Sequence, residues 1–151
     1  MEVLEFNLSG SRAAVIRPRA TLLQRPREEG LAHLGAIIDA VALPIAIFDA
    51  GRQLVQSNRA YAALWGLDPN WLRPGLDERV VLDRLRTMGM LPTEADYQAW
   101  RARHLQSYQL KQPRESDPWY LPDGRVVQVI SAPAGPHGGV IYVFEDITDA
   151  L

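Results

Sequence analysis

The sequence predicts an α+β fold in which two strands come first, several helices follow, and three strands end the chain. Short segments rich in β-branched and aromatic residues lie on both sides of a Gly-containing turn at residues 50–52, and again after Pro113. Between them, residues 77–109 show the spacing of apolar side chains that amphipathic helices require. Strands joined by short turns pair antiparallel, so we expect one antiparallel sheet with added helices.

Length and composition favour one compact domain with a flanking segment. The chain has 151 residues, of which 47% are hydrophobic and 23% charged, as in folded proteins. Its 16 basic and 18 acidic residues are interspersed, so no nucleic-acid partner is expected. The absence of cysteine excludes disulfides, thiolate catalysis and Cys-based zinc sites. No apolar run approaches the roughly 18 residues of a membrane span, so we expect a cytoplasmic location without direct membrane contact.

Residues 1–30 are expected to form an arm, a linker or the tail of a preceding domain. Residues 2–8 alternate apolar and polar side chains as a strand does, and prolines with clustered arginines then indicate an exposed linker. A helix over residues 31–41, called the leading helix below, is predicted to end before Pro44. Its apolar side chains recur at spacings of three and four: Leu34, Ile37, Ile38 and Val41.

The first two strands and the helix after them have recognisable ends. Residues 44–49 and 53–56 are predicted to form a hairpin, with Gly51 supplying the permissive backbone geometry of the turn. Asn58 is well placed to cap a short helix, because its side-chain oxygen can accept a hydrogen bond from a nearby amide. Gly66 is predicted to end that helix.

Two longer helices are predicted in the middle of the chain. Residues 77–88 have apolar side chains at helical spacing and acidic residues in the first turn, which the helix dipole favours. A further helix is predicted from Thr93 to about Gln109, because Thr93 followed by Asp96 resembles a capping box. Four side chains share one stripe of that helix: Tyr97, Trp100, His104 and Tyr108.

Three strands are predicted over residues 116–121, 126–131 and 139–144, with a turn at residues 122–124. In the last strand, side chains alternate between two faces. One face receives Val140, Tyr142 and Phe144, and the other receives Ile141, Val143 and Ile147. Both faces are apolar, so the face away from the sheet's own helices needs a cover. We expect the leading helix of this chain, or of a second copy, to supply it.

Three stretches carry a family resemblance. FDAGRQLVQSNRAYAALWG (residues 48–66) joins two strands through an acid-turn-Gly segment and adds an Asn-capped helix. LPDGRVVQVI (residues 121–130) is a hairpin, and FEDIT (residues 144–148) ends the last strand. Together they resemble the PAS domain family, as found in bacterial sensor histidine kinases. The resemblance covers residues 31–149, and the helical stretch 89–113 departs from it.

The resemblance implies a five-stranded antiparallel sheet with helices on one face, plus an N-terminal helix and an inserted helix. It also implies a signalling module that forms a homodimer or docks a partner and relays a signal to a C-terminal effector or kinase region. Residues 150–151 would begin the connector to that region. Asp146 and Thr148 would couple the last strand to the connector, with Asp146 hydrogen-bonded or paired with Arg125 or Arg52. The expected dimer or partner surface comprises Leu34, Ile37, Ile38, Val41, Tyr142 and Phe144.

A sensor that binds a noncovalent small ligand is the alternative. Four residues are expected either to line its pocket or to fill a core without a cavity: Phe48, Tyr61, Trp65 and Val129. Haem is not expected, because the helix over residues 77–88 contains no histidine and His104 reads as a packed side chain. A covalent flavin needs a cysteine, which the chain lacks. We therefore expect no resident cofactor.

A small α+β enzyme is the least favoured alternative. The acid-base candidates match no catalytic motif, since the chain has no Gly-rich phosphate loop, nucleophile elbow or histidine cluster. The candidates are Asp49, Asp83, Asp96, Asp117 and His104. Each of them is explained more simply as a cap, a turn residue, or a packed or solvated side chain. No catalytic residue and no metal ligand is predicted.

Overall fold

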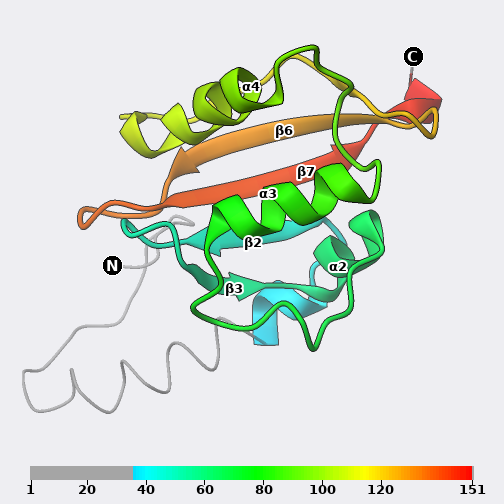
Figure 1. The fold of residues 1–151 in the computed structure, drawn as a ribbon. Helices are drawn as coiled ribbons and strands as arrows, with labels where there is room; N and C mark the ends of the chain where they lie inside the picture. The colour runs from blue at the N-terminus through cyan, green and yellow to red at the C-terminus, as the bar shows by residue number, and fades with distance from the viewer. Residues whose placement is uncertain (1–35, 151) are drawn as a thin grey trace, which may run out of the picture. The chain divides into compact units, whose positions relative to one another are not determined.

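The structure is a computed structural model that describes residues 36–150 (Figure 1). The chain divides into two units, Met1–Leu34 and Gly35–Leu151, and the description below concerns the second unit. The predicted arm over residues 1–30, Leu34 and the start of the leading helix lie outside the described residues. Of the leading helix, residues 36–41 are described: residues 36–40 are helical, and the helix ends one residue before the predicted last residue, Val41.

Strands and helices follow one another in the predicted order. The strands are β2 (Ile45–Phe48), β3 (Leu54–Ser57), β4 (Arg114–Glu115), β5 (Trp119–Tyr120), β6 (Val126–Pro133) and β7 (Val140–Asp146). The helices are α2 (Arg59–Trp65), α3 (Glu78–Thr87), α4 (Tyr97–His104) and the 3-10 helices η2 (Leu105–Gln109) and η3 (Thr148–Ala150). Within residues 36–150, no helix combines the length and the apolar character needed to cross a membrane.

All neighbouring strands pair antiparallel, in the order β3-β2-β7-β6-β4. β5 also pairs with β6, so β4 and β5 are two parts of one edge strand and the predicted five-stranded sheet is confirmed. The predicted strand over residues 116–121 has the wrong bounds, because pairing stops after Glu115 and resumes at Trp119. Pro118 lies in the break and has no N–H to donate to a neighbouring strand.

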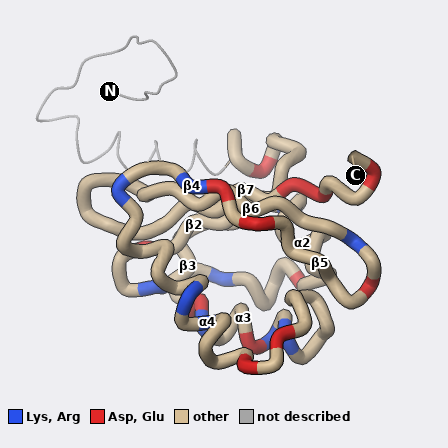
Figure 2. The backbone as a smooth tube through the Cα atoms, turned by 90° about the horizontal axis from the view of Figure 1, so that it is seen from above, with Lys and Arg blue, Asp and Glu red and all other residues tan. Residues whose placement is uncertain are grey.

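The core lies between one face of the sheet and the helices. α3 and α4 lie on the same side of the sheet (Figures 1 and 2). In β7 alternate residues are buried, and Val140, Tyr142 and Phe144 are each at most 4% exposed. Trp65 of α2 is the largest fully buried side chain. Burial of each large apolar side chain stabilises the fold by about 1.5–3 kcal/mol, so this layer supplies most of the stabilising free energy.

Short polar side chains cap the helices where the sequence predicts. Asn58 Oδ1 accepts a hydrogen bond from the backbone N–H of Tyr61 at 3.0 Å, and Gly66 ends α2 with a φ of 68°. Asp77 Oδ1 accepts from the backbone N–H of Arg79 at 2.7 Å and starts α3. The caps predicted at Asn58 and Gly66 are confirmed, because capping depends on residues close together in the chain. Asp77 is predicted inside the helix, whereas the structure makes it the cap that precedes the first helical residue.

The third predicted helix begins later than expected. Asp96, and not Thr93, is its cap: Asp96 Oδ1 accepts a hydrogen bond from the backbone N–H of Ala99 at 3.0 Å. The helix then changes to the 3-10 form at Leu105. The predicted stripe is confirmed, because Tyr97 is buried, Trp100 and Tyr108 pack against the core, and the His104 ring contacts the rings of Trp119 and Tyr142.

The turn between β2 and β3 also differs from its prediction. Asp49 Oδ1 accepts hydrogen bonds from the backbone N–H groups of Gly51 and Gln53, each at 2.9 Å. The left-handed backbone position belongs to Arg52, with a φ of 66°, and not to Gly51. Arg52 is held there because its carbonyl accepts a hydrogen bond from the backbone N–H of Glu78 at 2.8 Å.

Candidate functional site

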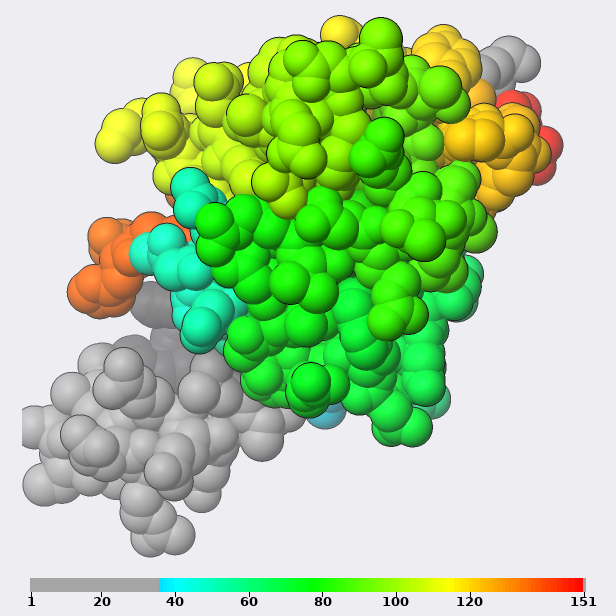
Figure 3. All heavy atoms as spheres, in the orientation of Figure 1, coloured from blue at the N-terminus to red at the C-terminus, as the bar shows by residue number. Residues whose placement is uncertain are grey.

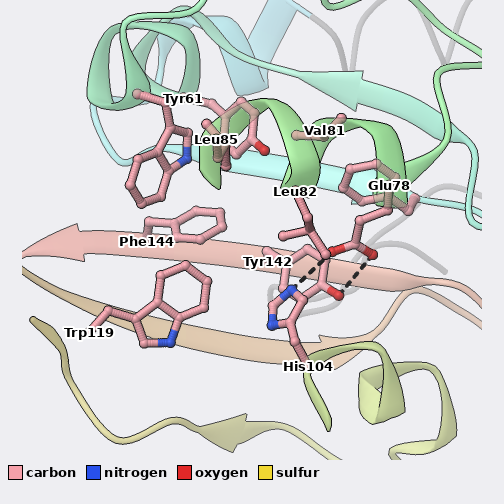
Figure 4. A pocket seen from close by; sticks show the side chains of 11 residues that line it. Tyr61, Glu78, Val81, Leu82, Leu85, His104, Trp119, Tyr142 and Phe144 are labelled. Carbon is pink, nitrogen blue, oxygen red and sulfur yellow. Dashed lines mark hydrogen bonds and ion pairs between the residues drawn. The ribbon is translucent and has the colours of Figure 1, made fainter. Parts of the chain in front are cut away.

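A buried carboxylate, Glu78, forms the centre of the domain's interior (Figure 4). It is the first residue of α3 and is 2% exposed. Its Oε1 accepts hydrogen bonds from the hydroxyls of Tyr108, at 2.6 Å, and Tyr142, at 3.0 Å. Its Oε2 lies 3.0 Å from Nε2 of His104. The carboxylate therefore joins α3, α4, η2 and β7, and every contact satisfies a polar group that burial would otherwise penalise.

The two tyrosines are fixed as hydrogen-bond donors. Burial, and then the charge of Glu78, raise the pKa of the Tyr108 and Tyr142 hydroxyls well above the usual range. Burial and the Glu78 charge likewise raise the pKa of the Tyr61 hydroxyl. These hydroxyls stay protonated at any physiological pH, so they can stabilise a carboxylate but cannot act as bases.

A small cavity lies beside Glu78. Its volume is about 10 Å³, close to the least that one water molecule needs. Of the four predicted pocket residues, Phe48, Tyr61 and Trp65 line it, whereas Val129 is buried in the core and is not part of its wall. Trp65 Nε1 is buried and has no hydrogen-bond partner among the described residues. In the space-filling view, the green atoms of α3 and the yellow-green atoms of α4 lie next to one another on the near face of the domain (Figure 3).

The sheet face away from the helices, called the open face below, is apolar. Strand pairing places Ile45, Val143 and Ile130 in one row across β2, β7 and β6. Ile47, Ile141 and Ala132 form the next row. These side chains alternate with the buried core residues, and Ile130 is 40% exposed. The predicted apolar second face of the last strand is confirmed for Ile141 and Val143. Ile147 lies beyond the end of β7, and Glu145 takes the next position on this face.

Two residues predicted for the dimer or partner surface do not lie on it. Tyr142 and Phe144 are 1% and 4% exposed, and both face the helices inside the domain. The error arose from the choice of face: their neighbours Ile141 and Val143 point to the open face. In the leading helix Ile38 is buried, whereas Ile37 and Val41 are 49% and 37% exposed and remain available for contact.

Asn58 joins the leading helix to the sheet and to α2. Its Oδ1 accepts hydrogen bonds from the backbone N–H groups of Tyr61 and Ile45, each at 3.0 Å. Its Nδ2 donates to the carbonyls of Ile38, at 3.0 Å, and Leu43, at 2.7 Å. The last residues of the leading helix are therefore held against the start of α2, with Ile38 buried beneath them.

The end of β7 forms a closed polar turn. Asp146 Oδ1 accepts hydrogen bonds from the backbone N–H and the hydroxyl of Thr148. Thr148 Oγ1 accepts one from the backbone N–H of Val126 at 2.9 Å, so the turn is tied to β6. The predicted pairing of Asp146 with Arg125 or Arg52 is absent among the ion pairs of the described residues: Arg125 pairs with Asp123.

The acid-base candidates have structural roles in the described residues. Asp83 accepts a hydrogen bond from the Tyr97 hydroxyl at 2.7 Å and pairs with Arg101 at 3.1 Å. Asp49 and Asp96 serve as turn and cap residues, and Asp117 is exposed. No group of three or more His, Asp or Glu side chains suited to a metal ion occurs within residues 36–150.

Sequence reasoning missed Glu78. At the start of a helix an acidic residue is ordinary, because the dipole favours it there, so nothing local distinguishes this one. His104 and Tyr108 were predicted to share a stripe with Trp100, but their common partner was not recognisable. Glu78 lies 26 residues from His104 and 64 from Tyr142 in sequence.

A family model described as PAS fold matches residues 38–151. Sensor protein DivL of Caulobacter vibrioides is 37% identical over 147 residues, which is 95% of this chain and 19% of that protein. The chain thus spans about a fifth of the length of that relative.

Solved structures agree in fold. The PAS domain of an HTR-like protein from Haloarcula marismortui has a TM-score of 0.53 at 16% identity, with 84% of this chain and 99% of that chain covered. A phage VqmA-DPO complex has a TM-score of 0.55 at 17% identity, with 85% and 57% covered. At such identities these structures show the fold alone. The family model and the relative show more: the chain belongs to the PAS family.

Proposed function

We propose that this chain is a cytoplasmic signalling module that works by association, with a second copy of itself seated on the open face. The proposal rests on the two rows of apolar side chains that cross β2, β7 and β6 on that face. An antiparallel sheet covered by helices on one side is ordinarily polar on the other. Ile130 is exposed and the other five side chains of the two rows are partly buried. A contiguous apolar surface that solvent can still reach is typical of a protein-binding site.

The leading helix extends the proposed contact. Ile37, Val41 and Leu43 are 49%, 37% and 44% exposed, although they belong to or directly follow a helix that is held in place by Asn58. Membership of the PAS family and similarity to a sensor protein support a role in signalling. We extend the proposal to the parent protein, which would carry a C-terminal effector such as a histidine kinase region.

A charged side chain on the open face should break the association. We expect Ile130→Glu in the full 151-residue chain to weaken dimerisation at least about tenfold, because a carboxylate would be buried without a partner. Val80→Glu is the control, since Val80 is 48% exposed on α3, on the helix side of the sheet. Sedimentation equilibrium measures both variants. A wild-type chain that stays monomeric at high concentration, or an equal loss in both variants, would contradict the proposal.

We further propose that the turn at Asp146 relays changes in the sheet to the connector. The Thr148 hydroxyl and then its N–H hold the pKa of Asp146 below its ordinary 3.8, so its ionised form stabilises the turn. This stabilisation is complete above pH 3.8 and is lost as the pH falls through the lowered pKa.

The relay predicts a local effect of Asp146→Ala. The backbone N–H of Thr148 loses its acceptor and the tie between Thr148 and Val126 loosens, so we expect these two amides to exchange hydrogen at least about tenfold faster. Signalling output of the parent protein should change with them. Asp149→Ala, in the same exposed 3-10 turn, is the control. Unchanged exchange and unchanged output in Asp146→Ala would remove the basis of the relay.

A second candidate function is the binding of a noncovalent small ligand. One observation favours it: Trp65 and Glu78 line the same cavity, and the buried Nε1 of Trp65 has no hydrogen-bond partner among the described residues. A buried donor without an acceptor is costly, and a ligand that accepts its hydrogen bond would remove that cost. The cavity of about 10 Å³ is far smaller than the roughly 300 Å³ of ordinary ligand pockets, so binding would require a movement of the wall.

A further inference from the structure

We propose that two carboxylates, Glu115 and Glu145, limit the strength of self-association through the open face and keep it reversible. The inference rests on the proposed function and names the residues that regulate it. The apolar rows supply the attraction between two copies, and the carboxylates at the border of the rows oppose it. The balance between attraction and repulsion, and not the apolar area alone, then sets the dissociation constant of the dimer.

Glu115 and Glu145 lie on the open face with the apolar rows. Glu115 of β4 pairs with Ile130 of β6, so it ends the row that contains Ile130. Glu145 of β7 comes two residues after Val143 and pairs with Gln128. Paired residues, and residues two apart in a strand, point to the same side of a sheet, and two residues span about 7 Å of a strand. Both carboxylates therefore border the apolar surface.

Neither carboxylate is neutralised within the part of the chain that the structure describes. Both residues are exposed, and neither takes part in an ion pair among residues 36–150. Arg114 is the only Lys or Arg in the described strands, and it lies on the helix side because its partner Ser131 faces the core. Arg59 of α2 pairs with Asp39 of the leading helix at 2.9 Å, so that pair adds no net charge.

A two-fold dimer through this face brings like charges together. Most homodimers have two-fold symmetry, in which the same patch of each copy forms the contact. Among the described residues, the only unpaired charges of the strands on this face are carboxylates, so carboxylates meet carboxylates whatever the angle between the copies. Like charges that approach across a contact oppose association, and added salt screens them.

This opposition suits a module that has to change state. An apolar contact with opposing charges at its border opens more readily than the same contact without them. Two copies held together in a parent protein have a high effective concentration, roughly millimolar for short flexible linkers, so a weak contact still forms there. The isolated chain should accordingly dimerise weakly, and its dimer should respond to salt.

Removal of the carboxylates should strengthen the dimer. We expect Glu115→Gln/Glu145→Gln, in the full 151-residue chain, to dimerise at least about threefold more tightly than the wild type at low salt. Raising sodium chloride from about 20 mM to about 500 mM shortens the Debye length from about 20 Å to about 4 Å, so it should tighten the wild-type dimer and leave this variant nearly unchanged. Glu94→Gln is the control for net charge, because Glu94 lies on the helix side near Arg103. Sedimentation equilibrium measures each chain.

Inversion of the charge tests the contact from both sides. Glu115→Lys/Glu145→Lys should repel itself but attract the wild type, whichever of the two positions meet. In an equimolar mixture with one chain labelled with nitrogen-15, native mass spectrometry counts the heterodimer and the two homodimers. At low ammonium acetate concentration we expect the heterodimer to exceed the two homodimers together by at least about threefold, and at high concentration to approach equal amounts, the statistical result.

The results separate this inference from the proposed function. Dimers of equal strength in the wild type and the double glutamine variant, or an equal change in Glu94→Gln, would overturn the inference and leave association in place. Statistical mixing at low salt would also overturn it, provided that thermal unfolding shows both chains to be folded. If the lysine variant does not fold, the glutamine variant decides alone. A chain that stays monomeric in every variant at both salt concentrations would contradict the proposed function and this inference with it.

Discussion

Glu78→Ala is expected to lower the free energy of unfolding by about 3–5 kcal/mol, because it leaves a cluster of buried hydrogen-bonding groups without its common partner. The hydroxyls of Tyr108 and Tyr142 and the Nε2 of His104 all lose the partner that now lies within 3.0 Å. Each unsatisfied buried group costs about 1–3 kcal/mol, and partial relaxation reduces their sum. Equilibrium unfolding in urea, followed by tryptophan fluorescence, measures the change.

Two variants show whether the loss comes from the buried carboxylate. Glu78→Gln keeps the size and one carbonyl acceptor, so we expect a smaller loss of about 1–3 kcal/mol. Glu94→Ala removes an exposed carboxylate that lies 3.7 Å from Arg103, and it should change stability by less than about 0.5 kcal/mol. If Glu78→Ala were as well tolerated as Glu94→Ala, Glu78 would not be the centre of the interior.

Gly139→Ala is expected to destabilise the domain by about 3 kcal/mol or more, for two reasons that add. Gly139 has a φ of 93°, where a residue with a Cβ is strained by about 1–2 kcal/mol. A Cβ would also lie 2.5 Å from the carbonyl oxygen of Phe48 and 3.1 Å from the Cα of Asp49. Backbone atoms cannot rotate away as a side chain can, so the pairing of β2 with β7 would have to shift.

The loops of the domain contain the controls for this prediction. Gly124 has the same φ of 93°, with nothing within 4 Å of an added Cβ, so Gly124→Ala isolates the backbone strain. At Gly135 a Cβ meets nothing within 4 Å and the φ is outside the left-handed region, so Gly135→Ala should be near neutral. Thermal unfolding should show the largest loss of stability for Gly139→Ala, a smaller loss for Gly124→Ala and the smallest for Gly135→Ala. If Gly139→Ala and Gly124→Ala lost the same stability, the contact between the added Cβ and the carbonyl oxygen of Phe48 would be relieved without cost.

Much of the secondary structure could be predicted because its signals are local. Asn58, Gly66 and Asp77 end or begin helices through contacts with residues within a turn of themselves. The Pro-Asp-Gly turn likewise places Gly124 at a positive φ and returns the chain within four residues. Such signals can be recognised in the sequence wherever the contacting residues are close together in the chain.

Predictions failed where two local solutions were of similar quality. Thr93 and Asp96 are both good caps, and packing of Tyr97 against Asp83 and the core favours the later start. Glycine is the ordinary choice for a left-handed turn position, yet Arg52 takes it. A long-range hydrogen bond from the N–H of Glu78 to the Arg52 carbonyl accompanies that conformation, and no local pattern contains it.

By itself, the sequence determined the order of the elements, the caps at Asn58 and Gly66 and which residues of a strand share a face, because these features follow from local contacts and from the periods of helices and strands. Tertiary structure alone decided which face of β7 is covered, and so moved Tyr142 and Phe144 from the expected surface into the core. It also brought Glu78 to three donors that lie 26, 30 and 64 residues away along the chain. Contacts over such separations depend on how the layers pack, which no short stretch of sequence encodes.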